Sequence, residues 1–361
     1  MNIIAIDLGK FKSMFCFHDS DTQNYPTSAA PTASDYFESV FKSQKPDLVV
    51  VEACGPSGWV SDLCQELEIP IIVCSTHEAA WLFKNVKRKT DKDDAIKLAR
   101  LAAMEQLKAV HVPSKAMREL KRLIKYRKGL VGRVNKCKNT IRSIFANQGI
   151  KITSGAQTWH TGRQQLIDES KPLPDCDQQE LWRGELDLEL TQLSAVEAHL
   201  KEVDKRLEAI AKEDTRIQRV MQIDGVGRVT AEAIVAHIDD AKRFRNKNQV
   251  SAYAGLVPRQ HQSGNTDRHG RITKRGPSLL RTLLVECAWT SLQYNTWSRQ
   301  TYERIHGGNQ TRRKKAAIAM ARKILVVAWA MLRDETDYDP DRNVMWEPEP
   351  VIEQTRQNKR E

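Results

Sequence analysis

The sequence has few cysteines, and their spacing excludes the common zinc-binding patterns. None of its seven cysteines forms a Cys-x-x-Cys pair. Cys54, Cys64 and Cys74 are too far apart for a zinc knuckle. We therefore interpret the cysteines as reduced thiols in the core of a cytoplasmic protein.

Long apolar runs are also lacking, which argues against a membrane protein. The most apolar stretch near the C-terminus, residues 316–332, contains Arg322 and Lys323, so it predicts a core helix and no membrane span. No charged leader precedes the first apolar run, which begins directly with a strand pattern. We expect neither export nor membrane association.

What the chain has in excess is positive charge. Its 361 residues carry a net charge of +11, and this length allows two or three domains. Residues 334–361 contain nine acidic and four basic residues, so residues 1–333 carry +16. A basic body favours DNA or RNA as a partner, with membrane surfaces a distant second. We expect a nucleoid-associated protein with a disordered acidic tail at 334–361.

Residues 1–112 alternate between strand and helix patterns. Strands are predicted at 3–7, 13–18, 22–25, 47–52 and 70–75, and helices at 34–43 and 57–67. A hairpin followed by alternating helices and strands is the order of a ribonuclease-H-like, or RuvC-like, α/β domain.

The rest of the chain reads as mainly helical. A long helix is predicted within 113–150, and its part 115–142 has eleven bases and one acid. In the region 151–215, polar residues up to 180 suggest a linker, and apolar residues spaced by three and four over 186–210 suggest a coiled-coil helix. An ordinary helix packed inside one domain fits that spacing equally well. Residues 216–333 resemble a compact helical domain with one long basic loop.

Four carboxylates stand where a metal site could form. Asp7 and Glu52 each end an apolar strand, and Asp91 and Asp94 lie three apart on one face of a predicted helix. Carboxylates that converge from different elements can hold Mg²⁺, and two ions would suit phosphodiester chemistry. Each acid alone also fits a strand-end turn, an actin-like phosphate loop or a helix cap. An actin-like enzyme would need a second Asp-Gly-rich loop, which the sequence lacks.

A serine lies in the most basic part of the chain. Ser263 falls in a predicted loop within residues 242–281, which contain ten bases and one acid. A serine beside bound phosphates is a candidate nucleophile, although it needs activation, and a turn serine in a DNA-binding loop is the alternative. We expect phosphate contacts from bases of this loop and of the long helix, namely Lys121, Arg122, Lys125, Arg259, Lys274, Arg275 and Arg281.

A glycine turn upstream suggests a helix-hairpin-helix element. Gly225 and Gly227 occur in Ile-Asp-Gly-Val-Gly at 223–227, between two helical patterns. In such an element, backbone N–H groups of the turn bind a phosphate without reading bases. A simple turn between packed helices is the alternative.

These stretches together resemble one known family. Over residues 1–333 the chain is similar to the DEDD insertion-sequence transposases, which pair a RuvC-like domain with a serine-bearing transposase domain. The resemblance is carried by AIDLGK at 5–10, VVEA at 50–53, KTDKDDA at 89–95, IDGVG at 223–227, YAGLVP at 253–258, SG at 263–264 and TKRG at 273–276.

The resemblance implies a particular recombination chemistry. It implies that Asp7, Glu52, Asp91 and Asp94 bind magnesium and that Ser263 attacks DNA to form a phosphoserine link. It also implies a homodimer or homotetramer whose subunits share the site, and a bridge RNA that pairs with donor and target DNA. Two other functions stay open: a RuvC-like nuclease in which water attacks and Ser263 is structural, and a non-catalytic nucleic-acid-binding protein.

Overall fold

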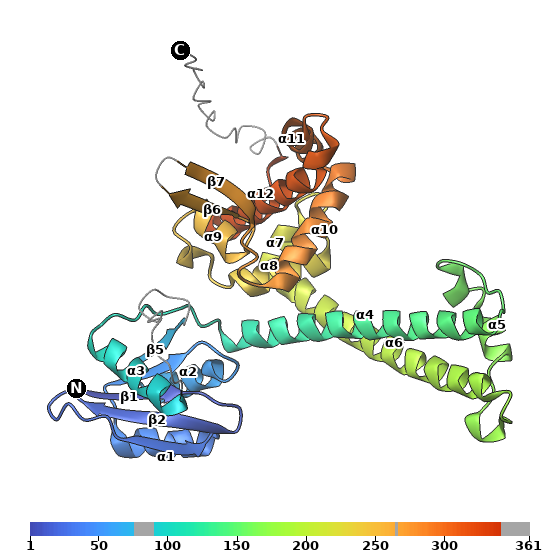
Figure 1. Cartoon of the computed structure of the whole chain (residues 1–361). Helices are drawn as coiled ribbons and strands as arrows, with labels where there is room; N and C mark the ends of the chain where they lie inside the picture. The colour runs from blue at the N-terminus through green and yellow to red at the C-terminus, as the bar shows by residue number, and fades with distance from the viewer. Residues whose placement is uncertain (76–89, 264–265, 341–361) are drawn as a thin grey trace, which may run out of the picture. The chain divides into compact units, whose positions relative to one another are not determined.

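The chain forms two compact units, Met1–Ala116 and Met117–Glu361. A computed structural model describes residues 1–75, 90–263 and 266–340 (Figure 1). Across these described residues, no helix is both long and apolar enough to cross a bilayer.

The first unit is a mixed sheet covered by helices on both faces. Its strands are β1 (Asn2–Asp7), β2 (Lys12–Asp19), β3 (Thr27–Pro31), β4 (Leu48–Glu52) and β5 (Ile71–Cys74), in the spatial order β3-β2-β1-β4-β5. The first three strands pair antiparallel, and β1, β4 and β5 pair parallel. Its helices are α1 (Ser34–Gln44), α2 (Ser57–Glu66) and α3 (Asp91–Ala103).

Alternation along the strands explains the layers. Ile4 and Ile6 of β1 belong to the core that includes residues of α1 and α2, whereas Ile3 and Ala5 belong to the core that includes α3. Successive strand residues point to opposite faces, so a continuous apolar strand can supply both cores. Helices α1 and α2 therefore cover one face of the sheet, and α3 covers the other.

The predicted order of hairpin, helix and strand is confirmed, but the third strand was misplaced. It lies at Thr27–Pro31 and not at residues 22–25. The Gln23 N–H donates to the Asp19 carbonyl over 3.0 Å, and Gln23 has a φ of 55°. This turn reverses the chain after β2, so the next strand starts five residues later than predicted.

The second unit is mainly helical. Its main helices are α4 (Lys115–Asn147, which starts just before the unit), α6 (Leu181–Glu213), α8 (Arg228–Ile238), α10 (Ser278–Tyr294) and α12 (Arg313–Asp334). Shorter helices are α5 (Arg163–Asp168), α7 (Thr215–Met221), α9 (Lys247–Tyr253) and α11 (Thr296–His306). Two strands, β6 (Pro258–Ser263) and β7 (Thr266–Ile272), form a hairpin that projects from the helices (Figure 1).

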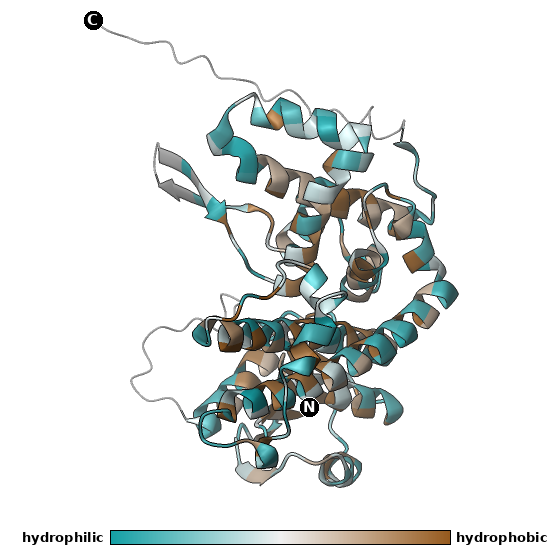
Figure 2. Cartoon of the chain, turned by 90° about the vertical axis from the view of Figure 1, so that its right-hand side faces the viewer, coloured by the Kyte–Doolittle hydropathy of each residue, from teal (hydrophilic) through white to brown (hydrophobic). Residues whose placement is uncertain are grey.

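Helices α4 and α6 pack along each other, and their apolar sides meet. Leu130, Val134 and Ile141 of α4 share one core with Leu190 and Leu193 of α6. Figure 2 shows that hydrophobic residues gather where helices pack on one another, whereas outward-facing helical turns are largely hydrophilic. The coiled-coil spacing predicted for residues 186–210 is therefore satisfied inside one chain.

The expected linker at 151–180 is packed. Thr158 and Leu166 are fully buried, and Leu166 joins the core between α4 and α6. Short helical turns and α5 occupy this segment, so it covers the end of the helix pair.

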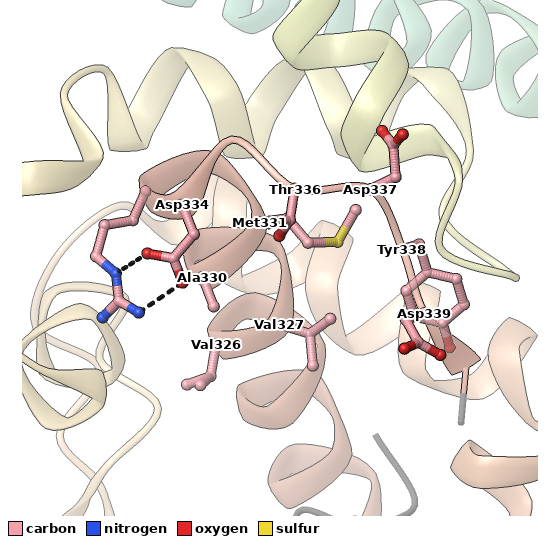
Figure 3. A pocket seen from close by; sticks show the side chains of 10 residues that line it. Val326, Val327, Ala330, Met331, Asp334, Thr336, Asp337, Tyr338 and Asp339 are labelled. Atoms are coloured by element: carbon pink, nitrogen blue, oxygen red, sulfur yellow. Dashed lines mark hydrogen bonds and ion pairs between the residues drawn. The ribbon is translucent and has the colours of Figure 1, made fainter. Parts of the chain in front are cut away.

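The start of the predicted disordered tail is also ordered. Residues 335–339 follow α12, and the Gln222 side chain bonds both the Asp337 carboxylate, at 3.0 Å, and the Tyr338 N–H, at 2.8 Å. Asn295 donates to the Tyr338 hydroxyl over 2.9 Å. Figure 3 shows Tyr338 and Asp339 lining a pocket of about 100 Å³ beside Val327. The prediction of disorder is wrong for this stretch, and residues 341–361 lie outside the described residues.

Candidate functional site

Asp7 and Glu52 end neighbouring parallel strands. Ile6 of β1 pairs with Val51 of β4, so each acid is the next residue after a paired position. Side chains two positions apart in a strand point to the same face, so Asp7 shares a face with Ile3 and Ala5, and Glu52 shares one with Leu48 and Val50. The four apolar residues all belong to the core that includes α3. Both half-buried acids therefore belong to the same face, at the same edge of the sheet.

Asp91 and Asp94 lie in the first turn of α3, on the stripe that faces the sheet. Ala95 and Leu98, which follow these acids by four residues each, are buried against the sheet. The helix cap uses a different acid: Thr90 Oγ1 donates to the Asp93 carboxylate over 2.7 Å and accepts from the Asp93 N–H over 3.2 Å. The reciprocal cap of this helix is therefore made by Thr90 and Asp93.

The structure gathers the four acids on one side of the sheet without closing a coordination shell. Within the described parts of the chain, no three His, Cys, Asp or Glu side chains are arranged as a metal site. The donor set nevertheless suits a hard divalent cation, because carboxylate oxygens from two strand ends and one helix belong to one face. Like charges at this edge are more stable with a cation between them.

Cys54 also lies at this edge, which the sequence did not indicate. Neighbouring atoms partly desolvate the Cys54 sulfur, although the residue as a whole is exposed, and this raises the pKa of the thiol; the negative charges of Glu52 and Asp7 raise it further. The side chain is exposed, so the interpretation of this cysteine as a core thiol is wrong. The shared effect of both acids on one thiol supports their closeness to each other. The only signal in the sequence was the position of Cys54, two residues after Glu52.

Two glycines lock the base of the β6–β7 hairpin. Gly255 has a φ of +68° and Gly276 a φ of +91°. A Cβ atom at Gly255 would meet the Arg275 carbonyl, and one at Gly276 would meet the Tyr253 carbonyl, each well under 3.0 Å. The two segments therefore cross backbone against backbone, which only glycine permits. The Lys274 N–H donates to the Gly255 carbonyl over 3.2 Å and closes this crossing.

Ser263 lies at the end of β6 and not in an irregular loop. Its backbone pairs with Thr266, next to the two residues that join the strands. The predicted loop is thus a two-stranded hairpin with Ser263 at its outer end, and its base is held by the glycine crossing.

Exposed cations follow both strands of the hairpin. Arg259, Lys274 and Arg275 of the predicted set are exposed, and so are Arg268 and Arg271 on β7. The sequence analysis counted Arg268 and Arg271 among the bases of this region but did not select them, because an irregular loop gives no basis for choosing between residues. In the structure both lie on β7, the strand that pairs with β6. Arg281 differs from the prediction, because it is half-buried and donates to the Ala254 carbonyl over 3.2 Å.

The glycines of the turn between α7 and α8 have different surroundings. Gly225 has a φ of +88°, and a Cβ there would meet the Ser291 backbone of α10 under 3.0 Å. Gly227 has open space around it and precedes the first residue of α8. Two helices joined by this turn are present, and the structure explains Gly225 by packing and leaves Gly227 available at the surface.

The predicted cations of α4 also divide into two groups. Arg122 and Lys125 are exposed. Lys121 instead turns inward: burial lowers its pKa to about 8, and Arg243 and Arg118 lower it further against the opposing charge of Asp239. Lys121 is therefore a poor candidate for a direct phosphate contact.

Two family models match the chain on either side of α6. Residues 4–147 match a DEDD-type transposase model of the IS110 group. Residues 217–303 match a model described as the transposase of the IS116/IS110/IS902 family. The first span includes all four predicted carboxylates, and the second includes the glycine turn and the hairpin.

Full-length relatives agree with these matches. A probable family 20 transposase of Pseudomonas aeruginosa is 29% identical over 345 residues, covering 94% of this chain and 100% of that protein. The transposase of insertion sequence element IS1111A from Coxiella burnetii is 28% identical, covering 94% of this chain and 91% of its own. The IS1328 transposase of Yersinia enterocolitica is 23% identical over 93% of this chain and 98% of its own. The chain belongs to the IS110/IS116/IS902 family of DEDD transposases, enzymes that cut and rejoin DNA.

Proposed function

We propose that this transposase exchanges DNA strands through a covalent link between Ser263 and DNA. The observation that carries the proposal is the glycine-locked hairpin, which holds the strand ending at Ser263 between exposed arginines and lysines. A nucleophile on a rigid, cationic element is positioned for a phosphodiester, since charge and orientation dominate phosphoryl transfer.

The proposed step conserves the phosphodiester bond energy. The Ser263 Oγ forms a bond to phosphorus while the P–O bond to one DNA segment breaks, and that segment leaves with a hydroxyl group. The serine proton is lost to solvent, and the leaving oxygen takes up a proton. Attack by the hydroxyl of another strand on the phosphoserine reverses these bonds and frees the serine. Arg259 and Arg268 stabilise the charge on the phosphoryl oxygens.

We propose further that Asp7, Glu52, Asp91 and Asp94 hold magnesium in a RuvC-like site, with two ions possible. Support comes from the sheet order, which has the antiparallel strands beside the parallel ones as in ribonuclease-H-like domains, and from the shared face of the acids. When bound, the cation stabilises negative charge at the scissile phosphate. The carboxylates would orient it from two strand ends and one helix, which leaves coordination positions for substrate oxygens.

Guidance by a bridge RNA and assembly as a homodimer or homotetramer belong to the same proposal. The exposed cations of α4, Arg122 and Lys125, support binding of a nucleic-acid backbone, and Gly227 supports a phosphate contact at the α7–α8 turn. The apolar stripe of α6 is already covered by α4. A contact between subunits through α6 would therefore use its outer side. Donor and target DNA in the nucleoid are the proposed substrates.

A single substitution separates this function from a RuvC-like nuclease. Ser263→Ala should abolish both strand exchange and the protein–DNA adduct on a denaturing gel. Ser278→Ala, which changes an exposed serine at the start of α10, is the matched control and should retain both. Cleavage that persists in Ser263→Ala would support the nuclease, in which water attacks.

The metal is tested separately. Treatment with EDTA should stop adduct formation by the wild type, and added Mg²⁺ should restore it. The Asp7→Asn variant should form no adduct even with added Mg²⁺. A non-catalytic binding protein predicts that Asp7→Asn changes nothing but stability.

A further inference from the structure

A run of four cations marks the junction of α11 and α12. Arg312, Arg313, Lys314 and Lys315 are all exposed, and no ion pair to them occurs among the described residues. We call residues 312–315 the basic turn. It lies beyond residue 303, where the family match ends, and residues 296–323 as a whole hold eight bases and one acid.

The basic turn opposes the dipole of the helix that it begins. The first turn of α12 contains no acidic residue, and no side chain caps its N-terminus. The positive end of a helix dipole disfavours cations there. The chain therefore has an electrostatic conflict at this point that nothing in the described structure relieves, and a bound polyanion would relieve it.

An aromatic cluster lies on the neighbouring helices. The rings of Trp289 and Tyr302 are 5.8 Å apart, and those of Tyr302 and His306 are stacked at 5.4 Å. Trp289 is 36% exposed. Arg299 donates to the carbonyls of Leu292, at 3.2 Å, and Gln293, at 3.3 Å, and so lies one helical turn from Trp289.

The aromatic cluster and the basic turn form one surface. Gly307 directly follows His306, and the Arg312 guanidinium lies 3.9 Å from the point where a Cβ of Gly307 would stand. Ring contacts thus run from Trp289 through Tyr302 to His306, and Arg312 lies beside Gly307, the residue that follows His306. Cations beside an accessible aromatic ring are the combination that binds unpaired nucleotides, since the cations hold phosphates and the ring stacks on a base.

We propose that this surface binds a single-stranded segment of nucleic acid, with phosphates at the basic turn and an unpaired base on Trp289. This rests on the proposed function, which requires DNA strands to separate or an RNA to pair with them. A duplex is disfavoured as the ligand because its bases are already stacked and cannot reach the ring.

The first test neutralises the basic turn. We compare Arg313→Gln/Lys314→Gln/Lys315→Gln with Lys201→Gln/Lys205→Gln/Arg206→Gln, which removes three exposed charges from α6. Fluorescence anisotropy with 20-nucleotide oligothymidine and oligouridine measures binding between 0.05 and 0.5 M salt, and the two oligonucleotides distinguish DNA from RNA. The first variant should bind at least tenfold more weakly near 0.1 M salt, with a salt slope lower by about 2. Its Tm should be equal to or above that of the wild type, because the conflict with the dipole is gone.

The second test examines the stacking. Trp289→Ala should weaken binding of the single strands about tenfold and leave binding of a 20-base-pair duplex unchanged. The inference is overturned if the α6 control loses as much affinity for single strands as the basic-turn variant does. It is also overturned if the basic-turn variant and Trp289→Ala both bind single strands as the wild type does. Adduct formation at Ser263 is scored in the same preparations. If the basic-turn variant and Trp289→Ala lose single-strand binding as expected but the wild type forms no adduct, the proposed function is overturned and this inference stands.

Discussion

Replacing Gly276 by alanine should inactivate the enzyme by moving the hairpin that ends at Ser263. At a φ of +91°, an L-residue costs about 1–2 kcal/mol or more. The new Cβ would also approach the Tyr253 carbonyl well under 3.0 Å, so one backbone segment must shift. That shift breaks the crossing with Gly255. A displacement of about 1 Å at the nucleophile can lower a rate about 100-fold.

The matched control is Gly270→Ala on the same hairpin. A Cβ at Gly270 would stand 3.6 Å from the Arg259 Cβ, which is an ordinary contact. Adduct yield on a denaturing gel and the thermal unfolding curve are measured for both variants. We expect Gly276→Ala to lose about 100-fold in adduct rate and Gly270→Ala to match the wild type. An active Gly276→Ala, or equal damage in both variants, would refute the reasoning.

Three further predictions concern the stability of the helical unit. Asp204 of α6 accepts from Arg127 at 2.7 Å and from Arg228 at 3.0 Å, so Asp204→Ala should lower the free energy of unfolding by about 2 kcal/mol in urea titrations; a loss below about 0.5 kcal/mol would contradict this. Burial lowers the pKa of His237 to about 4 in the folded protein, whereas the unfolded chain protonates this histidine near pH 6.5. The free energy of unfolding should therefore fall by roughly 3 kcal/mol as the pH drops from about 6.5 towards 4, and His237→Gln should reduce this dependence on pH. Tyr338→Phe should cost about 1 kcal/mol by the same titration, because Asn295 loses its bond to the hydroxyl; an unchanged midpoint would show that the docked tail adds nothing.

The sequence predicted the first unit well because its strands are buried on both faces. Continuous apolar runs such as 3–6 and 48–51 have to be strands in a covered sheet, and the acids at their ends follow from where the runs stop. The third strand escaped detection because Thr27–Pro31 is a short edge strand of small residues with only Ala30 buried. Its place depends on the turn that precedes it and on pairing with β2.

The hairpin could not be predicted from local pattern. Its strands are polar and basic, with no apolar alternation, and the force that fixes them is the crossing of Gly255 with Gly276, 21 positions apart in the sequence. The orientation of cations was equally hidden. Lys121 and Arg122 are neighbours in sequence, but one faces the core and the other the solvent, and only the packing of α4 decides which.

The central claim is most directly tested by locating the atom that DNA joins. Purified enzyme would be mixed with Mg²⁺ and its insertion-sequence DNA, quenched in denaturant, digested with nuclease and protease, and analysed by tandem mass spectrometry. The account predicts a nucleotide mass on the side chain of Ser263. DNA that is cut and exchanged while Ser263 remains unmodified, or a nucleotide on another residue, would contradict it.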